Sequence, residues 1–430
     1  MGDNRRMSIR QTSILLGLLC SLTVAFAENP SLKVNLDQVF AWARDNLEVQ
    51  LAQKGLIAAQ ADIVAADHAP APQLSAKLSQ MDLQHGLGAG SFWSAKRIDK
   101  GVGLDWTWER GDKRGWRTQA ATQGALAAGF DLQEVRQQQL LSAQAAYFDL
   151  MAAQSKWEDL TAIARSATEL SQAAAKRLAA GDLARQDADR AAIEADRARG
   201  DVDAMQAELT RARLALAQLI GREREAGHLA AVGAWPDALA WQDRATLEAQ
   251  LAQALQGVAL RSDVQAAAAR VEAAQAAWGG AKAQRSADVT WGASADHVPG
   301  TSTRQVELRL QMPLLWGYRF EGEAARSQAQ LDQSRDVLER TQRSAAAELQ
   351  RLHAELVAAA TRSRRYLQDI VPRSRSVADK AEMAYAKGAL SLTDLLDARR
   401  TLRAALMEST GAQADLAKAA TAWQLRTTAR

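Results

Sequence analysis

This chain of 430 residues is poor in residues that interrupt or cross-link a fold. It has one cysteine and seven prolines, and aromatic side chains make up 5% of it. The cysteine, Cys20, lies in the leader described below, which excludes a disulfide, a thiol nucleophile and a cysteine-based metal site from the mature protein. Scarce proline favours long uninterrupted helices.

The first 27 residues form a separate segment. Three arginines precede an apolar run over residues 14–19, and Ala25-Phe26-Ala27 has the form of a cleavage site. We therefore expect a signal peptide over 1–27, and export of a chain that begins at Glu28. No later apolar run reaches the ~18 residues of a membrane helix, so any membrane crossing has to be made by strands.

The sequence offers no convincing site for chemistry. Its five histidines are scattered without ligand spacing. Gly86, Gly88 and Gly90 form a GxGxG, but no helix start follows, which favours a strand-connecting loop over a phosphate cradle. The net charge of +3 is carried largely by the leader and is no nucleic-acid footprint. We expect no enzyme, no cofactor, no metal site and no nucleic-acid partner.

Most of the mature chain has the periodicity of long helices. Apolar residues recur at helical spacing over residues 129–179, 183–220, 324–371 and 390–425. Helices of this length span about 60–75 Å, which exceeds an ordinary globular core. On this pattern alone, solvated coiled-coil rods are an equal interpretation.

Four short segments alternate between apolar and polar residues, and they predict two pairs of strands. The expected outward apolar positions, which would face lipid, are Leu104, Trp106, Trp108, Val289, Trp291, Leu308 and Leu310. Seven of the twelve tryptophans lie in or beside these segments, as at a membrane interface. The alternative is a small sheet packed on a soluble core. If the strands do cross a membrane, four cannot close a barrel, so the chain must oligomerise.

Two glycines, Gly181 and Gly388, mark an internal duplication about 207 residues long. Leucines follow at +2, Leu183 and Leu390. Glycine within a helix costs about 1 kcal/mol relative to alanine, so its recurrence predicts a turn in each copy. A period this long indicates a duplicated domain and not a solenoid.

Three segments carry a family resemblance: WERGDKRGWRTQAA (108–121), RSDVQAAAARVEAAQAAW (261–278) and AYAKGALSLTDLLDARRTL (384–402). In this order they resemble the TolC-type outer membrane efflux proteins, the outer membrane factors of tripartite pumps. The resemblance runs from about Leu36 to Trp423. The first segment is more narrowly similar to the heavy-metal cation efflux branch, in which two glycines usually precede the lysine; Asp112 replaces one of them here.

The resemblance implies a mainly α fold with membrane β: a duplicated helix-strand-strand-helix-helix repeat, and a homotrimer whose 12-stranded β-barrel continues into a long periplasmic α-helical tunnel. It implies the outer membrane of a Gram-negative bacterium as the location. The implied partners are a periplasmic adaptor (membrane fusion) protein, an inner membrane pump of the resistance-nodulation-division type, and outer membrane lipid.

The resemblance also assigns roles to residues near the two glycines. Gly181, Leu183, Gly388 and Leu390 would mark hairpin tips that dock the adaptor. Asp394 and Asp397, three residues apart, share a helix face and would line the pore constriction. Asp187 and Tyr385 would be gate contacts. Related proteins place an arginine where this chain has Leu390, so the charged Asp187 latch is in doubt.

The expected organisation has four parts: a signal peptide over 1–27; a first repeat over 28–221, with strands at about 73–82 and 101–110 and a tip near 181; an irregular equatorial linker over 222–260; and a second repeat over 261–430, with strands at about 287–296 and 304–313 and a tip near 388. The expected function is a passive exit duct for small toxic solutes, metal cations or drugs. A protein-secretion exit channel and a periplasmic coiled-coil adaptor or scaffold are the alternatives.

Overall fold

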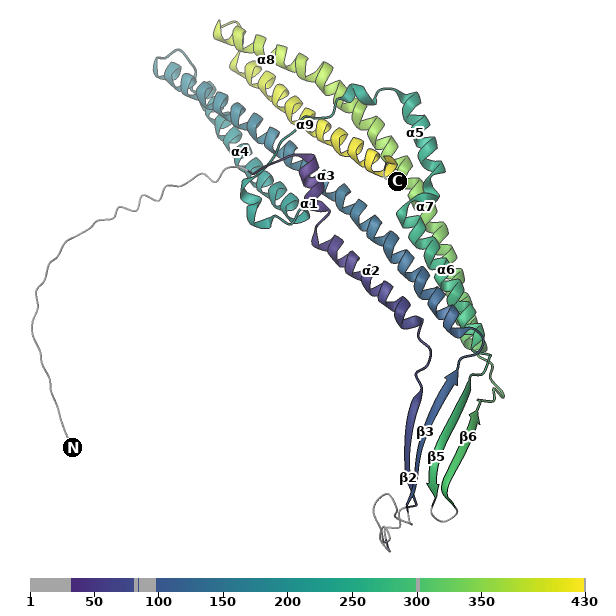
Figure 1. Ribbon diagram of the computed structural model, residues 1–430. Coiled ribbons are helices and arrows are strands. Elements are labelled where there is room, and N and C mark those ends of the chain that lie inside the picture. Colours follow the sequence, from purple (N-terminus) through teal and green to yellow (C-terminus); the bar gives the residue numbers. More distant parts are fainter. Residues whose placement is uncertain (1–31, 81–83, 85–97, 299–301, 429–430) are drawn as a thin grey trace, which may run out of the picture.

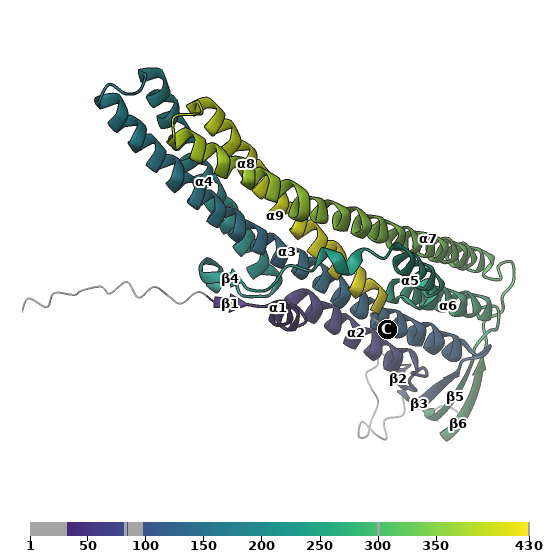
Figure 2. The ribbon, with the colours of Figure 1, turned by 90° about the horizontal axis from the view of Figure 1, so that it is seen from above.

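The computed structural model describes residues 32–80, 84, 98–298 and 302–428 of the chain. The expected signal peptide and the glycines of the GxGxG loop lie outside the described residues. Long helices pack side by side into an elongated bundle, and four strands project from one end of it (Figure 1). Two helical hairpins form the opposite end of the bundle (Figure 2).

The elements follow a duplicated order. The first half contains β1 (Leu32–Val34), α1 (Leu36–Ala43), α2 (Leu47–Ala66), β2 (Gln73–Ser79), β3 (Asp99–Trp108), α3 (Lys113–Ala179) and α4 (Arg185–Leu219). The second half contains α6 (Ser262–Ala283), β5 (Val289–Val298), β6 (Ser302–Gln311), α7 (Glu321–Arg365), α8 (Val371–Ala386) and α9 (Leu392–Thr428). Each half thus has a helix, two strands and a helical hairpin.

Helix α3 is longer than its apolar pattern predicts. It has 67 residues, which corresponds to about 100 Å, and it begins at Lys113, well before the expected start near Gly129. The added turns carry good helix formers and pack beside α2 and α6. Among the described helices, none is both long and apolar enough to cross a membrane.

Helices α7 and α8 are joined by a π-helical turn, η4 (Tyr366–Ile370), where the sequence pattern predicts a single helix to Val371. Pro372 explains the change. Because proline has no backbone N–H, it cannot make the usual bond to the carbonyl four residues earlier, and the local winding adjusts. The hydroxyl of Tyr366 in this turn donates to the carboxylate of Glu408 on α9.

The stretch between the halves is not irregular throughout, as residues 222–260 were expected to be. It contains η1 (Glu223–His228), β4 (Leu229–Ala231), η2 (Ala238–Trp241), the 13-residue helix α5 (Arg244–Gln256) and η3 (Val258–Leu260). Asp243 caps α5 by accepting hydrogen bonds from the backbone N–H groups of Ala245 and Thr246. Strand β4 pairs in parallel with β1, so this stretch is tied to the start of the described chain.

A tight contact fixes α3 against α6 close to the sheet. A Cβ atom on Gly279 of α6 would lie 2.6 Å from Cε3 of Trp116 on α3, whereas one on Gly280 would lie 3.5 Å from the Cβ of the same tryptophan. Only glycine at 279 lets the indole approach the helix backbone.

The four strands form one antiparallel sheet in the order β2-β3-β5-β6. Its register aligns apolar residues across all four strands, as in the row Leu74, Leu104, Ala293 and Leu308. Polar residues share the other face, where Arg309 of β6 reaches Asp105 of β3 at 2.6 Å across Gly292. Glycine is needed there, because a Cβ on Gly292 would lie 2.3 Å from the carboxylate of Asp105.

The apolar face of this sheet is uncovered. Leu104 is 52% exposed, Trp106 60% and Leu308 82%. The sheet projects beyond the helices, and none of them crosses this face (Figure 1). The sheet therefore does not pack on a soluble core within this chain.

Candidate functional site

The two hairpin ends are built by the same backbone motif. At the end of α3, Gly181 has a φ of 79°, its N–H donates to the carbonyl of Leu178, and the N–H of Asp182 donates to that of Arg177. This pair of bonds is a Schellman motif, which needs a residue in the left-handed region and so favours glycine.

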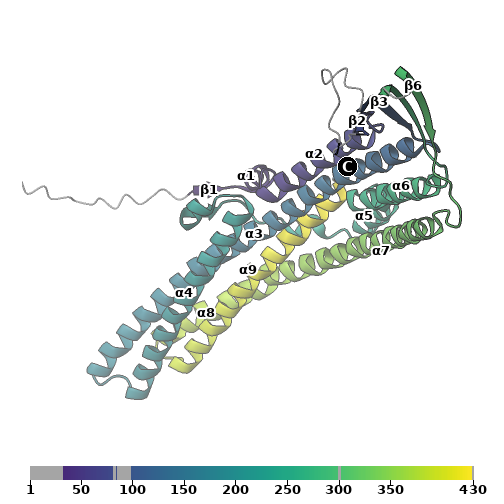
Figure 3. The same cartoon turned by 90° about the horizontal axis from the view of Figure 1, so that it is seen from below.

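The end of α8 repeats this arrangement. Gly388 has a φ of 73°, its N–H donates to the carbonyl of Tyr385, and the N–H of Ala389 donates to that of Ala384. Both glycines therefore stand at turns, and the two hairpins end side by side (Figure 3). The duplication in the sequence corresponds to the same helix terminator used twice.

The leucines after these glycines lie together. Leu183 and Leu390 both pack against one buried cluster made by the two hairpins. The buried members are Ala174, Ala188, Ala191, Ala381, Leu392, Leu395, Leu396 and Ala398. Leu390 is thus an apolar contact between the hairpins.

The two expected gate residues do not bond to each other. Asp187 pairs with Arg190 of its own helix, with 3.7 Å between Oδ1 and Nη1. Tyr385 packs at the edge of the apolar cluster, and the Arg177 guanidinium carbon lies 5.9 Å from its ring centroid. Within one chain, Tyr385 is therefore held by packing and a cation–π contact and not by Asp187.

The two aspartates expected at the constriction differ in their surroundings. Asp394 lies in the first turn of α9, where its carboxylate accepts from the Ser391 hydroxyl at 2.7 Å and its N–H donates back to that oxygen. Asp397 is 66% exposed and lies 3.5 Å from Arg400. Asp394 therefore has a capping role in the helix, and Asp397 has the freer side chain.

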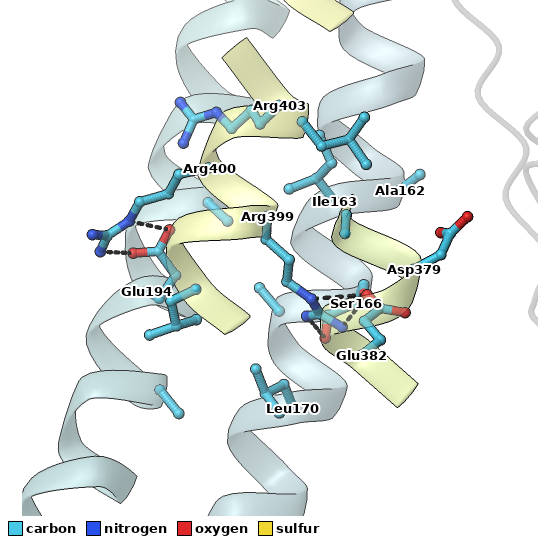
Figure 4. Close-up of a pocket in the computed structure, with 16 residues that line it drawn as sticks. Ala162, Ile163, Ser166, Leu170, Glu194, Asp379, Glu382, Arg399, Arg400 and Arg403 are labelled. Atoms are coloured by element: carbon cyan, nitrogen blue, oxygen red, sulfur yellow. Dashed lines mark hydrogen bonds and ion pairs between the residues drawn. The ribbon is translucent and has the colours of Figure 1, made fainter. Parts of the chain in front are cut away.

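Behind the tips, arginines of α9 connect the two hairpins. Arg400 contacts Glu194 of α4 at 2.7 Å (Figure 4), and Arg403 contacts Asp201 of α4 at 2.5 Å. Arg399 contacts Glu382 of α8 at 2.8 Å and donates to the carbonyl of Ser166 on α3. The hydrogen bond from Arg400 lowers the pKa of the Glu194 carboxyl, whose side chain is 15% exposed.

The sequence reasoning missed this connection, which we call the arginine seam (Arg399, Arg400 and Arg403 with their partners). Its residues are ordinary helix charges in the sequence. Only the arrangement of the helices shows that α9 faces α4 at this level. The signal that could have found them is the group of three arginines directly after the second tip.

The arrangement of helices and strands allows the fold to be compared with proteins of known structure. Elongated hairpins joined to a small sheet with an uncovered apolar face are the architecture of outer membrane channel proteins of known structure. The chain is similar to VceC from Vibrio cholerae, with 19% identity and a TM-score of 0.72, over 91% of this chain and 95% of that one. It is similar to CmeC of Campylobacter jejuni (16% identity, TM-score 0.71, 91% and 85% covered). It is also similar to the open state of MtrE of Neisseria gonorrhoeae, with 17% identity and a TM-score of 0.62, over 91% of this chain and 88% of that one.

The sequence itself identifies the family. Residues 43–222 and 243–426 match the family described as outer membrane efflux protein, so the chain belongs to it. Comparison with curated proteins found no match. The family consists of efflux channels of the Gram-negative outer membrane, so this chain is a transport protein and not an enzyme. Members work in tripartite pumps with an adaptor and an inner membrane pump.

Proposed function

We propose that this chain is the exit duct of a tripartite efflux system, through which an inner membrane pump expels small toxic solutes such as metal cations or drugs. Three copies would supply twelve strands to one barrel, and their helices would form a tunnel in the periplasm. A periplasmic adaptor would dock at the hairpin ends around Gly181 and Gly388.

The sheet is the observation that supports this proposal most directly. Its outer strands, β2 and β6, each have one strand neighbour within the described residues, and its apolar face is exposed. An unpaired strand edge is not tolerated in lipid, and an apolar face is not stable in water. In a closed ring of copies, β6 of one chain would pair with β2 of the next, and the apolar rows would face lipid.

We place the narrowest point of the duct at Asp397, with Asp394 beside it. A threefold axis would turn each residue into a ring of three carboxylates, and such a ring favours cations. Because Asp394 also caps α9, Asp397 should carry the larger share of the effect on ions. With Leu390 in the apolar cluster, opening would separate packed side chains more than it would break a charged latch.

The first test is the assembly of the purified protein. The full chain, extracted in detergent, is expected to have the mass of a trimer by light scattering corrected for detergent and to form channels in planar bilayers. A protein that stays monomeric and soluble without detergent would overturn the proposal.

The second test addresses the constriction. Asp397→Asn is expected to weaken block of the single-channel current by a trivalent cation, whereas Asp189→Asn, an exposed aspartate on α4, should leave block unchanged. Asp394→Asn should weaken block less, because the Asp394 carboxylate is already hydrogen-bonded to the Ser391 hydroxyl. Unchanged block in Asp397→Asn would remove this residue from the pore.

A further inference from the structure

A cavity of about 240 Å³ lies between the two hairpins, on the side of the apolar tip cluster that faces the middle of the bundle (Figure 4). All four hairpin helices line it. Each of three of these helices places alanines in the lining: Ala162 and Ala167 on α3, Ala191 and Ala198 on α4, and Ala378 on α8. Alanine side chains are too short to fill the space where two helix pairs diverge, so the gap stays open.

The arginine seam crosses this gap. Arg400 and Arg403 extend from α9 to acidic residues of α4, at 2.7 and 2.5 Å. Long side chains therefore connect the helices beside the cavity, and alanines make up part of its walls. Ile163, Leu170, Leu396 and Leu402 supply the larger apolar surface.

The three arginines around the cavity are already paired with carboxylates. Arg399 pairs with Glu382, Arg400 with Glu194 and Arg403 with Asp201. The carboxylate of Asp379, which also belongs to the lining, is directed away from the other labelled residues (Figure 4). A charged ligand would enter this space without a free counter-charge, at the usual high cost of burying an unpaired ion. The lining therefore selects for a neutral ligand.

The size and rim of the cavity restrict the ligand further. An apolar protein cavity of about 150 Å³ holds one benzene molecule, so 240 Å³ accommodates one or two fused rings. Guanidinium groups stack favourably on aromatic faces, and Arg399 and Arg403 both belong to the lining. We propose that this cavity is a binding site for a neutral, flat aromatic molecule of one or two rings, and that its occupancy holds the two hairpins together.

The coupling to the hairpins follows from where the contacts are made. A molecule in the cavity touches helices of both hairpins at once, and these contacts exist only while the hairpins keep the arrangement seen here. A ligand that binds one arrangement better shifts the population toward it. This inference concerns binding and stability of the folded chain, and it does not depend on the proposed duct function.

The test uses 2-naphthol as a neutral two-ring probe and the purified full chain in detergent. Equilibrium dialysis against matched empty micelles is expected to show saturable binding above micelle partition, and the probe should raise the Tm. Ala198→Leu, which fills the cavity, should weaken binding at least about tenfold and abolish the shift in Tm. Ala192→Leu, an exposed alanine on the same helix, should behave like the wild type.

Two further variants keep the test decisive. If Ala198→Leu does not fold, Ala198→Val, with less added volume, should show a smaller loss of binding. Glu194→Asp, which keeps the charge of the seam, should retain binding of the neutral probe. Wild-type affinity in a folded Ala198→Leu or Ala198→Val variant, or no binding above the micelle background, would overturn the proposal.

Discussion

At the scale of single residues, what distinguishes this chain is how glycine and alanine set distances between helices and strands. Gly279 admits the Trp116 indole to the backbone of α6, and Gly292 leaves room for the Asp105–Arg309 contact above β5. Alanines around Ala198 produce the opposite result and leave a cavity. A small or missing side chain thus allows close packing where a large neighbouring side chain fills the space, and it leaves a gap where no large neighbouring side chain does.

The glycine pair of α6 offers a test with an internal control. Gly279→Ala should destabilise the protein by about 1–3 kcal/mol, because the new methyl would overlap the Trp116 ring. Gly280→Ala should instead stabilise it by up to about 1 kcal/mol, since alanine is the better helix former and its methyl meets only the Cβ of Trp116, at an ordinary contact distance of 3.5 Å. Chemical denaturation in detergent measures both. Equal effects would show that the Trp116 contact is not the cause.

The seam carries a pH dependence that can be measured at Glu194. Its pKa is lowered in the folded protein by the hydrogen bond from Arg400, so the pair stabilises the fold fully above the unfolded pKa of glutamate. That contribution is lost as pH falls through the folded pKa. Glu194→Gln should therefore lower stability by about 1 kcal/mol at pH 7, and the difference from wild type should be smaller at an acidic pH below the folded pKa of Glu194.

The control for this prediction is Glu208→Gln. Glu208 pairs only with Arg211 of its own helix and is 52% exposed. Its replacement should change stability by less than about 0.5 kcal/mol at either pH. A Glu194→Gln effect that does not depend on pH would argue against the ion pair as its source.

At the scale of elements, the same helix terminator at both tips explains why the duplication is visible in the sequence. A Schellman turn needs a residue in the left-handed region, and this requirement favours glycine at both 181 and 388. The strands could also be predicted from the sequence, because alternation of apolar and polar residues indicates a strand. For example, β3 covers Asp99–Trp108, and the predicted segment is 101–110. Both signals are local.

The rest of the architecture could not be read from local patterns. The early start of α3 depends on how this helix packs along α2 and α6. The arginine seam depends on residues about 200 positions apart, such as Arg400 and Glu194. Even the Asp394 position was ambiguous, since a carboxylate three residues after Ser391 fits a helix cap as well as a pore ring.

The tip turn can be tested as an element. Gly388→Ala should destabilise the second hairpin by about 1–2 kcal/mol, because a φ of 73° places the alanine Cβ against its own backbone. Gly200→Ala, in the open middle of α4, should stabilise by up to about 1 kcal/mol. Hydrogen exchange of α8 and α9 amides reports the local effect. Unchanged protection around Gly388 would contradict the assigned turn.

At the scale of the whole molecule, a single chain leaves one apolar surface exposed. Its helices have buried clusters of their own, whereas its sheet exposes an apolar face. Leu104→Arg should therefore block assembly into the membrane, since an arginine at mid-bilayer costs about 2–4 kcal/mol per copy. Gln305→Arg, on the polar face, should assemble normally. Heat-modifiable mobility of membrane fractions measures both, and normal assembly of Leu104→Arg would mean that the faces are misassigned.

The unpaired edges of β2 and β6 also have a consequence for the life of the protein before it reaches its destination. Before assembly, a single chain exposes two strand edges, at β2 and β6, whose backbone groups can pair with any extended peptide, including a misaligned copy of the same chain. Correct assembly then competes with aggregation and degradation, and the rate at which copies of the chain associate decides the outcome. We expect the yield of functional protein to rise faster than linearly with expression until off-pathway pairing dominates. Chaperones that cover the strand edges should affect this yield more than the intrinsic stability of the chain does.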